Sequence, residues 1–259
     1  MTTDPSVLLS VGSGVATITL NRAEAKNRLD AESMALLLEH LHATAQDPQV
    51  RVVVLTGSGT TFCSGADLSG ALAATSGGFA SGGTSGLVEV LTAMLDHPKP
   101  IVGRIQGHVA GGGNGLVAAC DIAVASADAK FAFSEVRVGV APAIISVVCL
   151  QVMHRRDAQE LLLTGERVSA VRVREAGLVT QVVEADGLDA AVTGYVDQLA
   201  QGGPDAVART KELLRRVPAM TRDDAFAWTA EVSAGLFTSA EAREGMTAFI
   251  EKRKPEWAP

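Results

Sequence analysis

Three consecutive glycines, Gly111 to Gly113, precede an apolar segment, residues 116–120, that predicts a buried helix. Because glycine has no Cβ, a glycine turn lets the backbone come close to a bound group. A helix that begins in this turn would direct unpaired N–H groups and the positive end of its dipole at that group. The stretch from Val109 to Leu116 is therefore suited to hold an anion or a developing oxyanion. Close packing of a helix against a strand would use the same glycines, so that alternative stays open.

A second glycine-containing loop, residues 61–68, follows a short apolar segment, residues 51–56, that predicts a buried strand. The triple-glycine stretch likewise follows a predicted strand, residues 100–105. Loops at strand ends in α/β folds commonly form one binding site, so we expect the two loops to face one pocket. The chain has neither a G-x-G-x-x-G sequence after its first strand nor a G-K-[ST] phosphate loop, which argues against a nucleotide-binding fold.

Glu135 is the candidate acid or base, because it follows a predicted strand, residues 130–133, and has apolar neighbours. Burial disfavours the charged form of a carboxyl, so we expect these neighbours to raise the pKa of Glu135 toward a value useful in proton transfer. In the alternative interpretation Glu135 is a solvated turn residue or the ion-pair partner of Arg137. The apolar neighbours are Val136, Val138, Val140 and Ile144.

The histidines and cysteines predict no metal site and no disulfide framework. The histidines lack ligand spacing, and we expect them to be surface or packing residues. The cysteines are widely spaced and lie beside apolar residues, which favours buried thiols in a reducing compartment. These residues are His40, His42, His97, His108 and His154, and Cys63, Cys120 and Cys149.

Several elements must position the candidate residues. Residues 15–20 predict a strand, and Asp30 is the expected N-cap of a helix whose apolar residues extend to Leu41. Residues 69–86 are rich in Gly, Ser, Ala and Thr and predict a loop, either a lid over the site or a floppy insertion.

The C-terminal part of the chain predicts helices only, from Leu188 onward. The change of composition near residue 200 indicates a helical appendage without an intervening linker. Pro204 is expected to open one of its helices, and Thr238 with Glu241 has the capping-box spacing expected at the start of the last helix.

Composition limits the class of protein. The 259 residues are 47% hydrophobic and only 4% aromatic, which suits a large core of small side chains. A net charge of −7 argues against nucleic acid as the main partner. We see no signal peptide and no apolar run of about 20 residues that would span a membrane. The sequence therefore predicts a cytoplasmic protein that has no membrane partner.

Three motifs together, in this order and at this spacing, resemble the enoyl-CoA hydratase/isomerase (crotonase) family. The motifs are residues 62–68, 110–121 and 133–139, with weaker likeness at residues 17–22 and 244–253. The resemblance covers essentially the whole chain. It implies an α/β fold, a crotonase-like spiral of ββα turns with a helical C-terminal trimerisation region. Residues 1–200 would form the core with the acyl-CoA site. Residues 201–259 would form the oligomerisation region of a trimer or a dimer of trimers.

The family resemblance also implies a mechanism. The backbone N–H groups of Ala66 and Gly112 would stabilise the enolate oxygen of an acyl-CoA thioester, and Glu135 would be the acid/base. The family's other catalytic glutamate falls at Gly115, which is a departure from the two-glutamate hydratases. Some hydratases similar to 3-methylglutaconyl-CoA hydratase also carry glycine there and share a segment like residues 134–146. That longer likeness favours a hydratase nearest to those members.

The resemblance further implies the contacts to coenzyme A, which is part of the substrate, so no separate cofactor is expected. Backbone of the first turn, at Ala25 and Lys26, and of the loop after residue 63 would bind the ester. Ala143 would be the small residue beside the catalytic water. Phe249 and Lys252 of the last helix would contact the adenine and phosphate end. Glu89 and Asp67 are conceivable second acids, although a structural role suits each better. The binding residues are Ala25, Lys26, Ser64, Ala66, Asp67, Leu68, Gly112, Ala143, Phe249 and Lys252.

The sequence leaves alternatives to the hydratase open. A Δ3,Δ2-enoyl-CoA isomerase would use Glu135 alone, and a thioester hydrolase is a third enzyme option. A non-catalytic acyl-CoA-binding or RNA-binding relative is the alternative from another class. The acidic net charge and the lack of an aromatic and basic stripe count against RNA.

Overall fold

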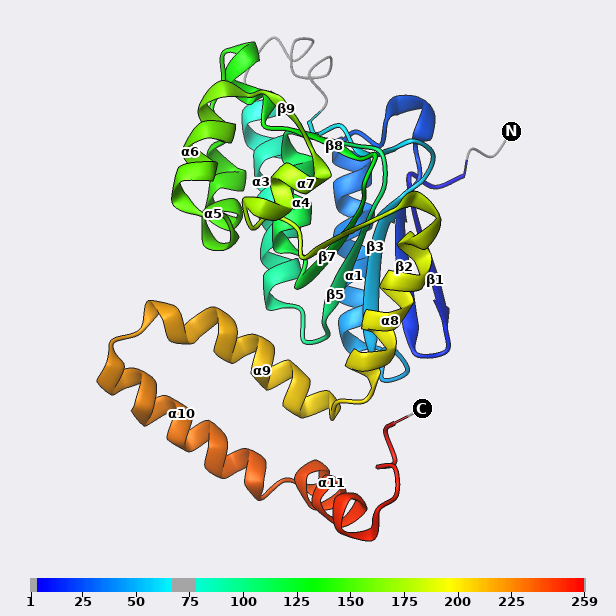
Figure 1. Ribbon diagram of the computed structural model, residues 1–259, viewed down its shortest axis with the longest axis vertical. Coiled ribbons are helices and arrows are strands. Elements are labelled where there is room, and N and C mark those ends of the chain that lie inside the picture. The colour runs from blue at the N-terminus through cyan, green and yellow to red at the C-terminus, as the bar shows by residue number, and fades with distance from the viewer. Residues whose placement is uncertain (1–3, 67–77, 259) are drawn as a thin grey trace.

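Two sheets organise the chain in the computed structural model, which describes residues 4–66 and 78–258 (Figure 1). The six-stranded sheet has the order β1 (Val7–Gly12), β2 (Val15–Leu20), β3 (Val52–Gly57), β5 (Ile101–Ile105), β7 (Ile122–Ser126) and β10 (Gln181–Val183). The four-stranded sheet has the order β4 (Thr61–Cys63), β6 (His108–Ala110), β8 (Lys130–Ala132) and β9 (Arg167–Ser169).

The strands alternate between the two sheets along the chain, which produces the expected spiral of ββα turns. Strands β3, β5 and β7 lie side by side and parallel in the larger sheet, and each is followed by a short strand of the smaller sheet. Strands β4, β6 and β8 are also mutually parallel. Their carboxyl ends therefore meet at one edge, and the loops that carry Ala66, Gly112 and Glu135 leave from that edge.

Helices cover the sheets and extend beyond them. They are α1 (Ala31–Gln46), α3 (Gly78–Asp96), α4 (Gly112–Ala119), α5 (Ala143–Val152), α6 (Arg155–Thr164), α7 (Ala170–Glu175), α8 (Leu188–Ala200), α9 (Pro204–Arg216), α10 (Arg222–Phe237) and α11 (Ala240–Glu251). Short 3₁₀ turns are η1 (Ala23–Ala25), η2 (Ser134–Val138), η3 (Ala185–Gly187) and η4 (Val217–Ala219).

The start of α1 confirms the cap expected from the sequence. The Asp30 carboxylate accepts from Ser33 N at 2.9 Å, and Ser33 Oγ accepts from Asp30 N at 2.9 Å. This reciprocal pair satisfies two groups that a helix end otherwise leaves unpaired. It fixes where α1 begins, directly after Leu29, which pairs with Ala66.

The hydrophobic core has two parts, one on each face of the six-stranded sheet. On one face, Leu37 and Leu41 of α1 pack with Leu55 of β3 and Met94 of α3 in the main cluster. The other face packs against α8, so that β3, β5 and β7 are buried on both sides. The residues of this second cluster are Val52, Val54, Val102, Val124, Leu188, Val192 and Val196. Burial on both faces explains why these strands are almost wholly apolar rather than alternating.

The prediction of a loop over residues 69–86 is wrong for its second half, because α3 already begins at Gly78. The stretch carries no helical period of apolar residues, and its helical state depends on tertiary packing. At Gly86 a Cβ would lie 3.3 Å from Met34 Cε, so the missing side chain lets α3 lie close to α1. The first half of the expected lid lies outside the described residues.

The helices from α9 onward project from the rest of the molecule as an arm (Figure 1). Helix α10 buries none of its residues. One guanidinium holds both ends of the arm: Arg51 donates to Gly202 O at 2.6 Å and to Trp257 O at 2.8 Å. The helical C-terminal part is as expected, whereas the division at residue 200 into two functional regions stays a prediction.

Pro204 opens α9, as expected, but the predicted capping box of Thr238 with Glu241 is wrong. Thr238 ends α10, and Ser239 caps α11 by accepting from Ala242 N at 3.0 Å. Because α11 begins one residue later than expected, Glu241 is free to cap another helix. Its carboxylate accepts from the N–H groups of Asp205 and Ala206, each at 2.9 Å, at the start of α9.

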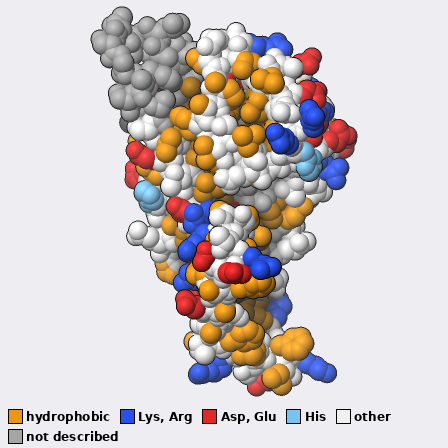
Figure 2. Space-filling model, turned by 90° about the vertical axis from the view of Figure 1, so that its left-hand side faces the viewer, with side chains coloured by type: hydrophobic (Ala, Val, Ile, Leu, Met, Phe, Trp, Pro, Cys, Tyr) orange, Lys and Arg blue, Asp and Glu red, His pale blue; other side chains and the backbone are white. Residues whose placement is uncertain are grey.

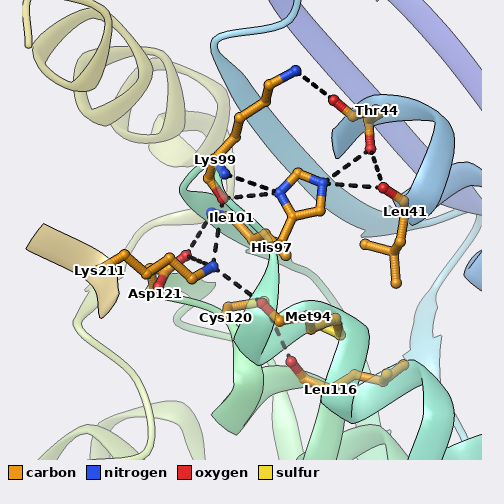
Figure 3. Close-up of polar contacts among 10 residues, drawn as sticks. All are labelled: Leu41, Thr44, Met94, His97, Lys99, Ile101, Leu116, Cys120, Asp121 and Lys211. Carbon is orange, nitrogen blue, oxygen red and sulfur yellow. Dashed lines mark hydrogen bonds and ion pairs between the residues drawn. The ribbon is translucent and has the colours of Figure 1, made fainter. Parts of the chain in front are cut away.

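A buried polar network at the end of α3 connects α1, β5 and α9 (Figure 3). His97 is 3% exposed, and its Nε2 lies 3.2 Å from both Leu41 O and Thr44 Oγ1. Nearby, Lys211 of α9 donates to Asp121 Oδ2 at 2.7 Å and to Met94 O at 3.1 Å. The network therefore attaches the first helix of the arm to the core.

The state of His97 predicts a pH dependence of stability. Burial, assisted by the charges of Lys211 and Lys99, lowers the pKa of His97 to about 4. The unfolded chain takes up this proton near pH 6.5 and the folded chain does not, so stability falls as pH falls from about 6.5 to about 4. We expect this residue to contribute about 3 kcal/mol to the free-energy difference across that window.

Urea unfolding of wild type and His97→Gln at a series of pH values measures this contribution. The variant should lose the His97 part of the slope, whereas His154→Gln, which changes an exposed histidine, should keep it. Parallel slopes for wild type and His97→Gln would contradict a neutral buried imidazole.

Candidate active site

Two glycine turns touch at the carboxyl ends of β4 and β6. Gly65 has φ +85° and Gly111 has φ +50°, backbone conformations that residues with a Cβ rarely adopt. A Cβ at Gly65 would lie 2.8 Å from Ala110 O and 3.0 Å from Gly112 N, so any side chain there would force the turns apart. The expectation that both loops face one place is confirmed.

The main-chain donors named from the sequence lie at this contact. Gly112 is the first residue of α4, and Ala66 follows Gly65 directly and pairs with Leu29. Among the described residues, neither Gly112 N–H nor Ala66 N–H has a hydrogen-bond acceptor. Unpaired N–H groups at a helix start are suited to bind an oxygen that carries negative charge.

Glu135 lies beside the same turn, on η2 directly after β8. Its Oε1 is 3.7 Å from the point that a Cβ of Gly111 would occupy. Its Oε2 is buried and has no hydrogen-bond partner among the described residues. In the described part of the chain, a half-buried carboxyl with an unpaired oxygen thus lies against a turn that leads into an unpaired N–H. A carboxyl can transfer a proton, and fixed N–H groups can stabilise a developing negative charge.

The pKa of Glu135 is raised, as expected, and burial is its main cause. The expectation that its apolar sequence neighbours bury the carboxyl is partly wrong, however, because Val138 and Val140 are more than half exposed. The carboxyl lies instead against the Gly111 turn, and its charge adds to burial in raising the thiol pKa of Cys149 to about 12. The ion pair with Arg137 is also absent among the described residues, since Arg137 donates to Thr164 O.

The position of the missing second glutamate is filled by apolar atoms. Gly115 lies on α4 one turn after Gly111, and a Cβ there would be 2.6 Å from Ile145 Cγ2 and 3.6 Å from Leu91 Cδ1. The side chain of Ile145 thus takes the space that a residue at 115 would enter. Glu89, considered as a second acid, is exposed in a groove between α1 and α3 instead.

The structure brings together part of the expected coenzyme A surface. Ala25 and Lys26 form the end of η1, where Lys26 adopts a left-handed conformation with φ 56°. Ser64 N donates to Lys26 O at 3.0 Å, which joins this turn to the loop after β4. Asp67 and Leu68 lie outside the described residues.

Other expected contact residues lie elsewhere in this chain. Phe249 and Lys252 belong to α11 and its end, which Figure 1 places at the opposite end of the molecule from α4. Phe249 is 85% exposed, so it contacts little of its own chain. Ala143 is exposed and begins α5, on the segment that follows Glu135.

Sequence reasoning missed Ile145 and Asn114 as parts of the site. Asn114 is fully buried at the start of α4, where its side chain donates to two carbonyl groups. An asparagine inside a glycine run at a helix start is a usable signal, because its amide competes for nearby backbone groups. No signal in the sequence alone pairs Ile145 with Gly115.

Other features of the described residues do not compete with this site. They contain no group of three His, Cys, Asp or Glu residues that could hold a metal ion, and none of their helices is long and apolar enough to cross a membrane. Cys63, Cys120 and Cys149 are free and buried, as expected. A hollow of about 970 Å³ lies between the end of α3, α9 and α10, but charges that line it are paired, as in Arg215–Asp96 and Lys211–Asp121.

Comparison with known proteins places the whole chain in one group. Residues 10–259 match a sequence model of the enoyl-CoA hydratase/isomerase family. A putative enoyl-CoA hydratase of Thermus thermophilus is 33% identical over 245 residues, 94% of this chain and 97% of that protein. An (E)-benzylidenesuccinyl-CoA hydratase of Thauera aromatica is 34% identical over 251 residues, 96% and 97% of the two chains. The crystal structure of a Mycobacterium smegmatis enoyl-CoA hydratase superposes with a TM-score of 0.93 at 36% identity and covers 99% of this chain and 100% of its own.

The packing at Gly115 predicts that a second acid cannot simply be added. Gly115→Glu should destabilise the protein by about 1–3 kcal/mol through overpacking against Ile145. Ile145→Ala alone should cost about 2–5 kcal/mol by leaving a cavity. In the double variant the new side chain enters that cavity, so the two losses should not add.

Chemical unfolding of the wild type and the three variants forms a double-mutant cycle that measures this coupling. Gly194 is a suitable control, because it has open space around the position of an added Cβ. Gly14 is not suitable, because its φ is positive and a side chain there would be strained. Gly194→Ala should therefore leave the free energy of unfolding within about 0.5 kcal/mol of wild type or raise it. Strict additivity of the Gly115 and Ile145 changes would contradict the contact.

Proposed function

Because the chain belongs to the enoyl-CoA hydratase/isomerase (crotonase) family and has its fold, we propose that it adds water across the double bond of a 2-enoyl-CoA thioester. One observation carries this proposal. The carboxyl of Glu135, whose pKa is raised, lies against the Gly111 turn. The next residue, Gly112, has an N–H without a partner among the described residues, and this N–H lies beside the Gly65 turn. The hydratase names of similar proteins support hydration rather than isomerisation.

The proposed reaction has two proton transfers. Glu135 removes a proton from water as the water oxygen bonds to the β-carbon of the thioester. Electrons of the double bond move onto the thioester oxygen, where Ala66 N–H and Gly112 N–H stabilise the charge. Protonated Glu135 then returns its proton to the α-carbon, so that H and OH are added and the carboxylate is restored. Loss of one such main-chain donor typically costs about 2.7–4 kcal/mol of transition-state stabilisation.

A Δ3,Δ2-enoyl-CoA isomerase is the second candidate. The apolar contact of Ile145 at Gly115 favours it, because a single carboxyl is enough to move a proton between two carbons. Assays with crotonyl-CoA and with a 3-enoyl-CoA separate the two. A hydratase removes the conjugated absorbance of the first, whereas an isomerase creates it from the second. The expected likeness to 3-methylglutaconyl-CoA hydratase stays a prediction, and 3-methylglutaconyl-CoA belongs in the same assay.

The proposed active form is a homo-oligomer, a trimer or a dimer of trimers. Large apolar side chains of the arm are exposed: Phe226, Phe237, Phe249 and Ile250 are each 70% exposed or more. Helices α5 and α6 expose Val147, Leu150 and Leu163 as well. Figure 2, which views this side, shows hydrophobic side chains over the upper part of the molecule and along the projecting helices. Exposed apolar surface on this scale is typical of an interface.

In such an assembly, an arm that extends from one subunit supplies residues to the site of another. This would bring Phe249 and Lys252 to a coenzyme A bound by a neighbour. Light scattering tests the assembly, because the expected particle has three or six times the mass of the 26.7 kDa chain. A monomer at micromolar concentration would contradict it.

Glu135→Gln tests the assigned base. The variant keeps the size of the side chain but cannot take up a proton, so kcat should fall by about 10²–10⁴-fold. In wild type, activity should fall as pH falls through the pKa of Glu135, which burial raises from its ordinary value, because the base must begin unprotonated. Steady-state rates measured against pH give kcat and its pH dependence. Calorimetric binding of a saturated acyl-CoA gives the affinity for the ester.

Binding should survive in Glu135→Gln, since main-chain groups and the η1 turn hold the ester. Glu184→Gln, which changes an exposed glutamate between β10 and η3, is the matched control and should keep full activity. Full turnover by Glu135→Gln would reject the assigned base.

A further inference from the structure

Asn114 is the third residue of α4, and the proposed proton transfers make no use of it. Its side chain is completely buried. Its Nδ2 donates to Ala132 O at 2.9 Å and to Gly111 O at 3.3 Å. One amide group thus joins two main-chain carbonyls that lie 21 residues apart in the sequence.

The two carbonyls belong to the two halves of the proposed site. Gly111 immediately precedes Gly112, whose N–H is the proposed donor to the thioester oxygen. Ala132 ends β8, three residues before Glu135. Gly111 N also donates to Ala132 O, at 3.2 Å, so this carbonyl receives two hydrogen bonds from the start of α4.

The orientation of the Asn114 amide follows from its partners. Carbonyl oxygens accept and cannot donate, so the NH₂ end of the amide must face them. Its Oδ1 remains buried without a partner among the described residues, which opposes folding. An apolar side chain would avoid that cost, but it would leave both carbonyls without this donor.

The neighbouring residues cannot fix the turn by themselves. Gly111, Gly112 and Gly113 have no side chains, and glycine backbone has the widest conformational freedom. Atoms of Gly65 and Cys63 pack against the turn, as the short distances to an added Cβ at Gly65 and Gly113 show. The hydrogen bond from Gly111 N to Ala132 O is one tie of the turn to β8, and the Asn114 side chain adds a second.

We propose that Asn114 is a positioning residue, which fixes the Gly112 N–H relative to the Glu135 carboxyl by bridging Gly111 O and Ala132 O. The inference rests on the proposed function. A displacement of about 1 Å between reacting groups can cost about 10²-fold in rate, so the bridge acts on the chemical step more than on binding of the ester. The coenzyme A surface near Lys26 and Ser64 is held by other hydrogen bonds.

Asn114→Ala removes the bridge, and Asn114→Ser keeps one shorter hydroxyl donor. For the alanine variant we expect kcat to fall by about 10²-fold while KM changes by less than about threefold. The serine variant should recover part of kcat. Carbon-13 NMR titration of Glu135 in the ligand-free protein should show its pKa closer to the ordinary carboxyl value in the alanine variant, because a displaced carboxyl gains hydration.

Thr44→Val is the matched control for loss of a buried polar group. Thr44 is 1% exposed and donates to His40 O at 2.8 Å. It lies 14 residues beyond Asp30 on α1, which is about 21 Å along the helix from the end near the site. This variant should lose stability while kcat and the Glu135 titration stay as in wild type.

The outcomes separate this inference from the proposed function. Wild-type kcat and an unchanged Glu135 pKa in Asn114→Ala would overturn the positioning role, even if Glu135→Gln is inactive. If Glu135→Gln keeps full activity, the proposed function fails, and the NMR titration still decides whether Asn114 positions Glu135. If Asn114→Ala does not fold, the same two measurements on Asn114→Ser decide: wild-type values reject the role, and reduced kcat with a shifted pKa supports it.

Discussion

The contact between the two glycine turns is the constraint on which the rest of the site depends. Gly65 lies so close to Ala110 O and Gly112 N that no side chain fits between them. This approach is possible because β4 and β6 are parallel neighbours whose carboxyl ends stop at the same edge. The spiral of ββα turns therefore has a direct chemical result. It brings two main-chain N–H groups, of Ala66 and Gly112, from segments far apart in the sequence to one place.

Around this contact several polar atoms lack a partner among the described residues. The Glu135 Oε2 has no partner, and neither do the two main-chain donors, among the described residues. Unpaired buried groups oppose folding, whereas the capping pairs at Asp30 and Glu241 and the network around His97 satisfy their polar groups fully. The unpaired groups of the site therefore carry a cost in stability, which pairing and packing elsewhere offset.

Residue types and local spacing were enough to predict the features that depend on neighbours in the sequence. These include the Asp30 cap and the two glycine turns, whereas the pKa of Glu135 is raised, as predicted, by burial that involves the distant Gly111 turn. Features that depend on distant contacts could not be predicted. Gly78 begins a helix because α3 packs on α1, and Ile145 occupies the space at Gly115 because α4 and α5 lie together. The prediction that Val138 and Val140 bury the Glu135 carboxyl was partly wrong for the same reason, because residues close in the sequence need not pack on one another in the fold.

The Arg51 guanidinium holds Gly202 and Trp257 together, so the two ends of the arm meet at one residue of the core, and Lys211 attaches α9 to the core as well. The arm is thus a helical segment whose first and last residues lie close together at Arg51. The glycine turns belong to strands of the small sheet and not to this segment. A change in the length of α10 or α11 would therefore leave the order of those strands, and the contact between the two turns, as it is.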